Sequence, residues 1–519
     1  MYKVEDTPKG TFYTSHWFDG LAHTHRFDIV PQDDTVKVFY SSRRQSDDMM
    51  AYIQEHGRRK YFSFGQRRDP CLGLFAKIMS TWRASRIKPA DKGIENVNVV
   101  VHPNLPGLVG VPIADGAPVT DKSRPLSSQS GHRSAMPESM WVATDNSTLK
   151  QMDPETLEPI GFATQQSLHP DLGGPMSCAH AQRDPETGDV FNFNLQMGRF
   201  PTYRIFRVSA STGKTDILAT ITGPGIAPAY IHSFFLSPSY VVLCIPSSHL
   251  AFSGLKVLWE RNILNAIEPF STDKKCKWFV VDRLHGKGVV ARFESEAGFF
   301  FHTINAFEER IGKDSGSLGL YCDAIEYPSL DIMSSLYYDV LLGKDGADAR
   351  FWGDTKRARS CMARLARYQL NISTVSKGSM PGGQEGAGAI TKVFSIPAPH
   401  CGDLPTINPR FATRQHRYVY SLSFSGRSMP ADGIVKTDTE TREARFWNIS
   451  PGHTPGEAIF VPRPDGTDED DGILLSVVLD GSSKTSYLIC LDAKTMSEVG
   501  RAEIGFAVAF GFHGVHVQM

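Results

Sequence analysis

The feature that most limits the fold is a strand–turn–strand pattern that recurs along nearly the whole chain. In each copy, a run rich in β-branched and aromatic residues ends in a polar turn containing Asp, Ser, Thr or Gly, and a second run follows. The copies begin at Arg26, Gln151, Arg207, Val280, Val435 and Cys490. Successive turns near positions 153, 209 and 282 are 56 and 73 residues apart, and those near 437 and 492 are 55 apart. Such repeats are typical of the four-stranded blades of a β-propeller.

The pattern therefore predicts an all-β chain in which residues 1–519 form one propeller domain. Two separate β-sandwiches are the alternative that the turn spacing leaves open. Helical signals are few. Residues 46–57 carry Ser46 as a candidate N-cap and Gly57 as a candidate C-cap, and helices are also predicted at 74–82 and 354–370. Segments 117–139 and 376–389 are polar and rich in Gly, Ser or Pro, which predicts surface loops.

Charge and cysteine content narrow the class of protein. The 55 Lys and Arg nearly balance the 56 Asp and Glu, so no overall field attracts nucleic acid, and no nucleic-acid partner is predicted. None of the eight cysteines forms a CxxC pair, which favours a reducing compartment over a thiolate metal site. The start lacks the pattern of a signal peptide, and no run of about 18 apolar residues occurs. We expect a cytoplasmic protein.

Four of the seventeen histidines lie beside apolar, aromatic-rich runs: His180, His232, His302 and His513. They are 52, 70 and 211 residues apart, so no local metal motif is present. The innermost strands of a propeller face one axis, however, and single residues from different blades can meet there. Four imidazoles would suit iron, copper, nickel or zinc. The alternative is that each histidine is an ordinary core residue bonded to a backbone carbonyl.

Several motifs together resemble the carotenoid cleavage oxygenases, the family of the retinal pigment epithelial membrane protein. They are HWFDGLAHTHRF (16–27), SCAHAQRD, IHSFFLSPSYVV, FFFHTINAFEE, GEAIFVPRPDGTDEDDGILLSVVLDG (456–481) and the terminal FGFHG, in the same order over most of the chain. The resemblance implies a seven-bladed propeller with a few helices and loops capping one face. It also implies Fe(2+) on the axis, with His180, His232, His302 and His513 as its ligands.

The same resemblance implies three carboxylates behind the histidines, at Asp145, Asp403 and Glu457. A carboxylate that accepts the far N–H of a ligand imidazole fixes the ring and raises its basicity. Two of the three are Asp where many relatives have Glu. The shorter side chain requires either closer backbones or an intervening water.

The implied reaction is O2-dependent cleavage of a conjugated C=C bond into two carbonyl products, with the alkene held in an apolar tunnel. Candidate tunnel residues are Phe234, Phe235, Phe299, Phe300, Phe301, Phe510 and Phe512, each of which could equally be core. Stilbene-cleaving relatives carry a lysine where this chain has Thr144, which favours an apolar polyene. The sequence is most similar to the fungal torulene-cleaving branch, so the expected substrate is a carotenoid or apocarotenoid and the products are apocarotenals.

Three further expectations concern partners and alternatives. Residues 72–89 mix apolar and basic side chains, which suits an interfacial contact with membranes or lipid bodies, or else a helix packed on the propeller. The chain starts directly at YKVEDTPKG, so the N-terminal segment of the family is expected to be absent. The alternative functions are a stilbene-cleaving oxygenase, an isomerase that consumes no O2, and a noncatalytic propeller that binds other molecules.

Overall fold

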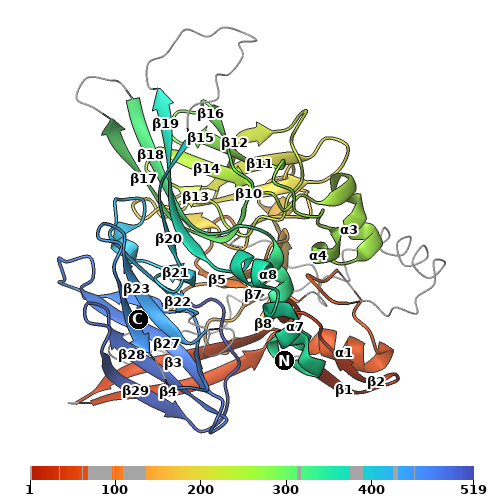
Figure 1. Ribbon diagram of the computed structural model, residues 1–519, viewed down its shortest axis with the longest axis vertical. Helices are drawn as coiled ribbons and strands as arrows, with labels where there is room; N and C mark the ends of the chain where they lie inside the picture. Colours follow the sequence, from red (N-terminus) through yellow and green to blue (C-terminus); the bar gives the residue numbers. More distant parts are fainter. Residues whose placement is uncertain are drawn as a thin grey trace, which may run out of the picture.

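The fold is a β-propeller built from antiparallel sheets that follow one another along the chain (Figure 1). The computed structural model describes residues 3–33, 35–60, 62–67, 96–97, 99–108, 136–311, 317–373, 390–424, 431–448 and 450–518. Within these residues, each of the six main sheets contains strands that are consecutive in sequence, and five of the sheets pair them in chain order. Up-and-down connection of this kind explains the regular spacing of polar turns in the sequence.

The first three main sheets run from residue 100 to residue 295. They comprise β5 (Val100–Pro103), β6 (Met140–Ala143), β7 (Thr148–Met152) and β8 (Pro159–Thr164); β9 (Gln182–Arg183), β10 (Val190–Gln196), β11 (Thr202–Val208) and β12 (Thr215–Ile221); and β13 (Phe235–Leu236), β14 (Tyr240–Ile245), β15 (Cys276–Asp282) and β16 (Val289–Ser295). Strands β10, β14 and β15 are almost entirely buried on both faces, because each sheet of a propeller packs between two neighbours.

The next three main sheets run from residue 299 to residue 504. They comprise β17 (Phe299–Ile311), β18 (Ser317–Tyr327), β19 (Arg364–Ser373) and β20 (Ile390–Pro397); β21 (Asp403–Thr406), β22 (Tyr418–Ser423), β23 (Gly433–Asp438) and β24 (Ala444–Asn448); and β25 (His453–Pro455), β26 (Ile459–Pro462), β27 (Gly472–Asp480), β28 (Thr485–Asp492) and β29 (Glu498–Ile504). In the last sheet both β25 and β26 pair with β27.

Two hairpins precede the main sheets: β1 (Lys3–Thr7) with β2 (Gly10–Tyr13), and β3 (His23–Gln32) with β4 (Thr35–Arg44). The second hairpin contacts both the first and the last main sheet. The Arg26 guanidinium donates to the carbonyl of Glu155 in the β7–β8 turn, and the Tyr40 ring lies 5.4 Å from that of Phe506, just after β29. The hairpin therefore occupies the position between the two ends of the row of sheets.

The resemblance predicted seven blades, whereas the described residues form six sheets of blade size. The difference arises at the β3–β4 hairpin, because only two strands pair in the position where a full blade would have four. The prediction of an all-β propeller with few helices is confirmed by these sheets, which follow one another along the chain.

Helices are short and gather on the right side of the molecule in Figure 1. The α-helices are α1 (Asp47–His56), α3 (Leu255–Glu260), α4 (Ile263–Ala266), α5 (Asp331–Ser335), α6 (Tyr338–Leu341), α7 (Ala347–Trp352) and α8 (Thr355–Ser360). The 3₁₀ turns are η1 (Trp17–Asp19), η3 (Gln165–Ser167), η4 (Ala251–Gly254), η5 (Lys344–Gly346) and η6 (Pro409–Phe411).

Two of the three predicted helices can be compared with the structure. The helix at 46–57 is confirmed as α1, which ends at Gly57 with φ of 64°. The prediction for 354–370 is wrong beyond residue 360, because Arg364–Ser373 forms β19 between β18 and β20. Pairing on both sides outweighs the helix propensity of its Arg, Leu and Ala residues. The segment 74–82, loop 376–389 and nearly all of 117–139 lie outside the described residues.

Candidate metal centre

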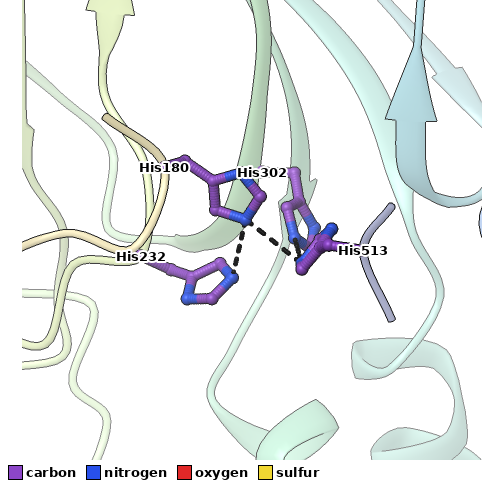
Figure 2. Close-up of side chains that lie close together, drawn as sticks. All are labelled: His180, His232, His302 and His513. Carbon is purple, nitrogen blue, oxygen red and sulfur yellow. Dashed lines mark hydrogen bonds between the residues drawn. The ribbon is translucent and has the colours of Figure 1, made fainter. Parts of the chain in front are cut away.

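Four histidine rings converge on one point, with their Nε2 atoms facing inward (Figure 2). The Nε2 atom of His180 lies 3.1 Å from that of His232 and 3.1 Å from that of His513, and the Nε2 atoms of His302 and His513 are 3.3 Å apart. His232 and His302 are buried, and the other two are half-buried. The structure thus brings together the four histidines that the sequence singled out.

Each ring is delivered by a segment at the start of a sheet or at the chain's end. His180 and His232 lie just before β9 and β13, and a parallel bridge joins His180 to Ser233. His302 lies within β17, where the register with β18 shifts between Phe300 and Thr303. His513 follows β29 in the C-terminal segment. In a propeller, the first strands of successive sheets lie around a common axis. Histidine side chains that are 52 to 333 positions apart in the sequence therefore meet there.

Carboxylates hold three of the four rings by the opposite nitrogen. Nδ1 of His232 lies 2.8 Å from Oδ2 of Asp145, and Nδ1 of His302 lies 2.6 Å from Oδ1 of Asp403. Nδ1 of His513 lies 2.9 Å from Oε1 of Glu457. The contacts of the two aspartates are direct, so the backbones approach closely enough to offset the shorter side chain and no water has to intervene.

Further donors fix two of these carboxylates. The Tyr230 hydroxyl donates to Oδ2 of Asp145 at 2.8 Å, and the Tyr327 hydroxyl donates to Oδ2 of Asp403 at 2.7 Å. Burial, and then the neighbouring carboxylate, raises the pKa of each tyrosine well above its usual value, so both hydroxyls keep their proton. Burial acts to raise the pKa of Asp403, but His302 and the donors to the carboxylate hold it below its usual value.

The hydrogen bonds determine where the protons of three rings lie. A carboxylate only accepts, so Nδ1 of His232, His302 and His513 carries a proton, and in the neutral form of each ring Nε2 presents a lone pair. Burial, followed by the neighbouring rings, lowers the pKa of His180 well below its usual value, and burial also lowers the pKa of His302 and His513. Neutral rings at pH 7 are therefore expected for His180, His302 and His513.

Lone pairs 3.3 Å apart on His302 and His513 cannot form a hydrogen bond with each other, and a cation between them removes the repulsion. An ion about 2.1 Å from each nitrogen places neighbouring nitrogens roughly 3.0–3.4 Å apart. The observed separations of 3.1–3.3 Å fit this arrangement. The four side chains can hold one metal ion, as their mutual reach within 4.8 Å also indicates.

A cavity of about 1540 Å³ reaches this centre and is lined by His232, His302 and His513. Much of its wall is aromatic. Trp17 of η1 packs on Phe510 and Phe512, with ring centroids 4.7 and 4.5 Å away. Phe18 lies 5.5 Å from both Phe301 and Phe512. An elongated apolar molecule suits such a wall.

Of the seven candidate tunnel phenylalanines, Phe301, Phe510 and Phe512 line the cavity. Phe234, Phe235, Phe299 and Phe300 do not, and instead belong to the packed core. Thr144 lines the cavity next to Asp145. The candidate membrane contact at 72–89 lies outside the described residues.

Several residues of the site were not predicted from the sequence. Tyr230 and Tyr327 bond to the carboxylates, and Trp17 and Phe18 line the cavity. Tyr230 had a usable signal, since it lies two residues before His232 and therefore on the same face of an extended segment. Trp17 and Phe18 stand in the HWFDGLAHTHRF motif, whose role the sequence left unassigned.

Fold and side chains together define a β-propeller with a candidate four-histidine metal centre that opens into an apolar cavity. The chain belongs to the RPE65 family, described as retinal pigment epithelial membrane protein, which matches residues 2–518.

The chain is 56% identical to a carotenoid dioxygenase of Neurospora crassa over 519 residues, covering 100% of this chain and 85% of the relative. It is 46% identical to a torulene dioxygenase of Fusarium fujikuroi, covering 99% and 86%. A crystal structure of cobalt-substituted Synechocystis ACO matches with a TM-score of 0.69 at 21% identity, covering 98% of this chain and 89% of that one, which shows the shared fold.

These relatives confirm the predicted family and the predicted class of enzyme, a dioxygenase of the carotenoid-cleaving kind. They do not identify the ion, and the roles of the four histidines and three carboxylates stay predictions. Across the part of the chain that the structure describes, no helix has both the length and the apolar character needed to cross a bilayer.

Proposed function

We propose that the protein holds Fe(2+) through His180, His232, His302 and His513 and uses O2 to cleave a conjugated C=C bond of a carotenoid or apocarotenoid, giving aldehyde products. The observation that carries the proposal is the set of three rings whose Nδ1 protons are committed to carboxylates. Their Nε2 lone pairs face one point at the wall of an apolar cavity.

The four imidazole ligands favour a divalent ion that keeps coordination positions open. Four imidazoles bring no charge, and Asp145, Asp403 and Glu457 compensate the ion from behind the rings. Six-coordinate iron with four protein ligands would retain two open positions and supply activation of O2. Imidazole alone does not distinguish iron from copper, nickel or zinc, so the choice of iron follows the family resemblance.

The remaining residues of the site position the substrate. The aromatic wall formed by Trp17, Phe18, Phe301 and Phe512 would bind a polyene by contact and exclude water from the centre. A bound double bond close to the four rings gains the rate advantage of fixed orientation. Tyr230 and Tyr327 would keep the carboxylates, and through them the rings, in place.

The substrate is proposed to be a torulene-like carotenoid. Two relatives that are 56% and 46% identical to the chain are named carotenoid dioxygenase and torulene dioxygenase. Thr144 supports an apolar substrate, because the cavity carries a hydroxyl and no ammonium at that position. A phenol would lack the cationic partner that the lysine of stilbene-cleaving relatives provides.

We also propose that residues 1–519 form one domain and that the β3–β4 hairpin is a reduced seventh blade that closes the ring. Its contacts with the β7–β8 turn and with Phe506 support this arrangement. A location in the cytoplasm and contact of 72–89 with membranes remain predictions.

The function is tested with purified protein reconstituted with Fe(2+) and supplied separately with torulene, β-apocarotenals and resveratrol. We expect aldehydes from the polyenes, one O2 consumed per cleavage, and loss of activity and of bound iron in His232→Ala. The matched control is His400→Ala, since His400 is exposed and outside the cavity lining. Cleavage of resveratrol alone, product formed without O2 uptake, or His232→Ala as active as the control would each contradict the proposal.

A further inference from the structure

His180 differs from the other three histidines of the centre in how it is held. Among the described residues, no carboxylate lies within ion-pair distance of its ring, whereas His232, His302 and His513 each have one. Its ring nevertheless makes two of the three Nε2 contacts of the cluster. Something other than a carboxylate must therefore set its position.

The backbone next to His180 is held from two sides. The Ala179 N–H donates to Oδ1 of Asp145 at 3.1 Å. The Ala179 carbonyl lies 3.0 Å from Nε2 of His102, a residue of β5. A carbonyl only accepts, so Nε2 of His102 carries the proton and donates it. Both polar groups of Ala179 are thus occupied, and Ala179 itself is fully buried.

Strand β5 and the residue after it also bond to the segment that follows His180. The Arg183 guanidinium donates to the carbonyl of Pro103 at 2.8 Å and to that of Asn104 at 3.2 Å. The chain is therefore bonded on both sides of His180. His102 bonds to Ala179, which precedes His180, and the carbonyls of Pro103 and Asn104 accept from Arg183, which follows it. These contacts join the first main sheet to the second. The parallel bridge between His180 and Ser233 fixes the other side of the loop.

Asp145 consequently acts on two rings. Its Oδ1 accepts from Ala179 N–H, next to His180, and both of its oxygens lie within 2.9 Å of Nδ1 of His232. A shift of the Ala179 backbone would move the His180 ring relative to that of His232, because Ala179 directly precedes His180 and is bonded to the carboxylate that holds His232.

We propose that His102 is a positioning residue for His180, acting through the Ala179 carbonyl, and that Asp145 and His102 together clamp the backbone of Ala179, the residue that places this ligand. The inference rests on the proposed role of His180 as a metal ligand. In this proposal, hydrogen bonds to the backbone of Ala179 orient the His180 ring, whereas carboxylates bonded to Nδ1 orient the other three rings.

The test uses Co(2+) bound to the full chain, because its visible absorption reports the geometry of its ligands without any turnover. We expect His102→Leu to change the Co(2+) absorption bands and to weaken Co(2+) binding about 10-fold, the usual scale for loss of an outer partner of a metal ligand. In His102→Gln the side-chain amide can replace the Nε2–H donor, so the wild-type spectrum should return. His102→Asn, which is too short to reach the carbonyl, should behave like His102→Leu and serves if the leucine variant does not fold.

A double-mutant cycle separates the clamp from general loosening. His102→Leu combined with Asp145→Asn should be non-additive in Co(2+) affinity, because both side chains hold the backbone of Ala179, whereas His102→Leu with Asp403→Asn should be additive. The stability control is Leu149→Ala, which removes buried apolar contacts in the same first sheet. It should lower the melting temperature and leave the spectrum unchanged.

The outcomes distinguish this inference from the function on which it rests. Wild-type protein that binds no Co(2+) or Fe(2+) overturns the proposed metal centre and the clamp with it. Wild-type binding together with an unchanged spectrum and affinity in His102→Leu, or a His102→Gln variant no better than His102→Asn, overturns the clamp alone.

Discussion

The hydroxyl of Tyr327 donates a hydrogen bond of 2.7 Å to Oδ2 of Asp403, while Oδ1 of the same carboxylate lies 2.6 Å from Nδ1 of His302. A tyrosine, an aspartate and a histidine are thus connected in series toward the point where the four rings meet. Tyr230, Asp145 and His232 form a second series of the same composition. The Glu457 carboxylate has a backbone donor, the N–H of Gly514, in place of a tyrosine.

Replacing Tyr327 by Phe removes the donor to Oδ2 of Asp403, a half-buried carboxylate that lines the cavity. We expect the free energy of unfolding to fall by about 1–3 kcal/mol, the scale of a hydrogen bond to a charged group. Metal affinity should fall by about 10-fold, because Asp403 orients His302 less firmly. Thermal unfolding of the metal-free protein and titration with Co(2+) measure the two effects. Tyr418→Phe is the control, since Tyr418 does not line the cavity; equal metal affinity in both variants would contradict the role given to Tyr327.

Replacing Thr144 by Lys places an ammonium in the wall of an apolar cavity. An unpaired charge in such a wall is costly, so we expect kcat/KM for torulene to fall by at least about 10-fold. Thr144→Val is the matched control, because it keeps the shape and adds no charge, and it should retain activity. Product analysis with torulene and resveratrol measures the change. Undiminished torulene cleavage by Thr144→Lys would show that this position does not face the substrate.

Much of the centre could be predicted because its chemistry needs particular residue types. His180, His232, His302 and His513 stood out as single histidines in apolar runs, and the three carboxylates followed from the family pattern. Tyr230 and Tyr327 were missed because a tyrosine in an apolar strand looks like ordinary core until its hydroxyl partner is known. His102 was missed because its partner is a backbone carbonyl, and every residue has one.

The errors in the predicted fold also arise because tertiary contacts, which the sequence does not display, decide the local structure. Residues 364–370 have the composition of a helix, and pairing with β18 and β20 makes them a strand. The wall phenylalanines could not be separated from the core ones, since Phe300 and Phe301 alternate faces of one strand and only the packed sheets decide which face meets the cavity. The number of strands that pair at the β3–β4 position likewise depends on contacts that cannot be read from the sequence.

Replacing Trp17 by Ala removes the ring that packs on Phe510 and Phe512. Trp17 belongs neither to the four histidines nor to the carboxylates bonded to them, so bound iron should stay at the wild-type level. We expect KM for torulene to rise and kcat/KM to fall by about 10-fold, because a large apolar contact with the substrate is lost. Trp17→Phe should recover most of the activity. Steady-state kinetics with parallel metal analysis checks the result, and loss of iron together with activity would point to collapse of the site instead.

His16 gives the chain a dependence of stability on pH that can be isolated. Its ring is fully buried, Nε2 donates to the Met333 carbonyl at 2.8 Å, and Nδ1 accepts from the Phe18 N–H at 3.2 Å. Burial lowers the pKa of His16 to about 4, although Asp19 opposes the shift. Between pH 6.5 and about 4 the unfolded chain therefore binds a proton that the folded protein does not, so the stability contributed by neutral His16 is lost as the pH falls through this window.

The size of this effect follows from the shift, which corresponds to about 3 kcal/mol between the two ends of the window. Other buried histidines titrate in the same range, so the measurement compares the wild type with His16→Asn, whose amide does not titrate. We expect the variant to be less stable at pH 7 and to lose less stability on acidification to pH 4. Urea unfolding at a series of pH values gives both quantities. Parallel stability curves for the two proteins would mean that His16 is protonated equally in the folded and unfolded states.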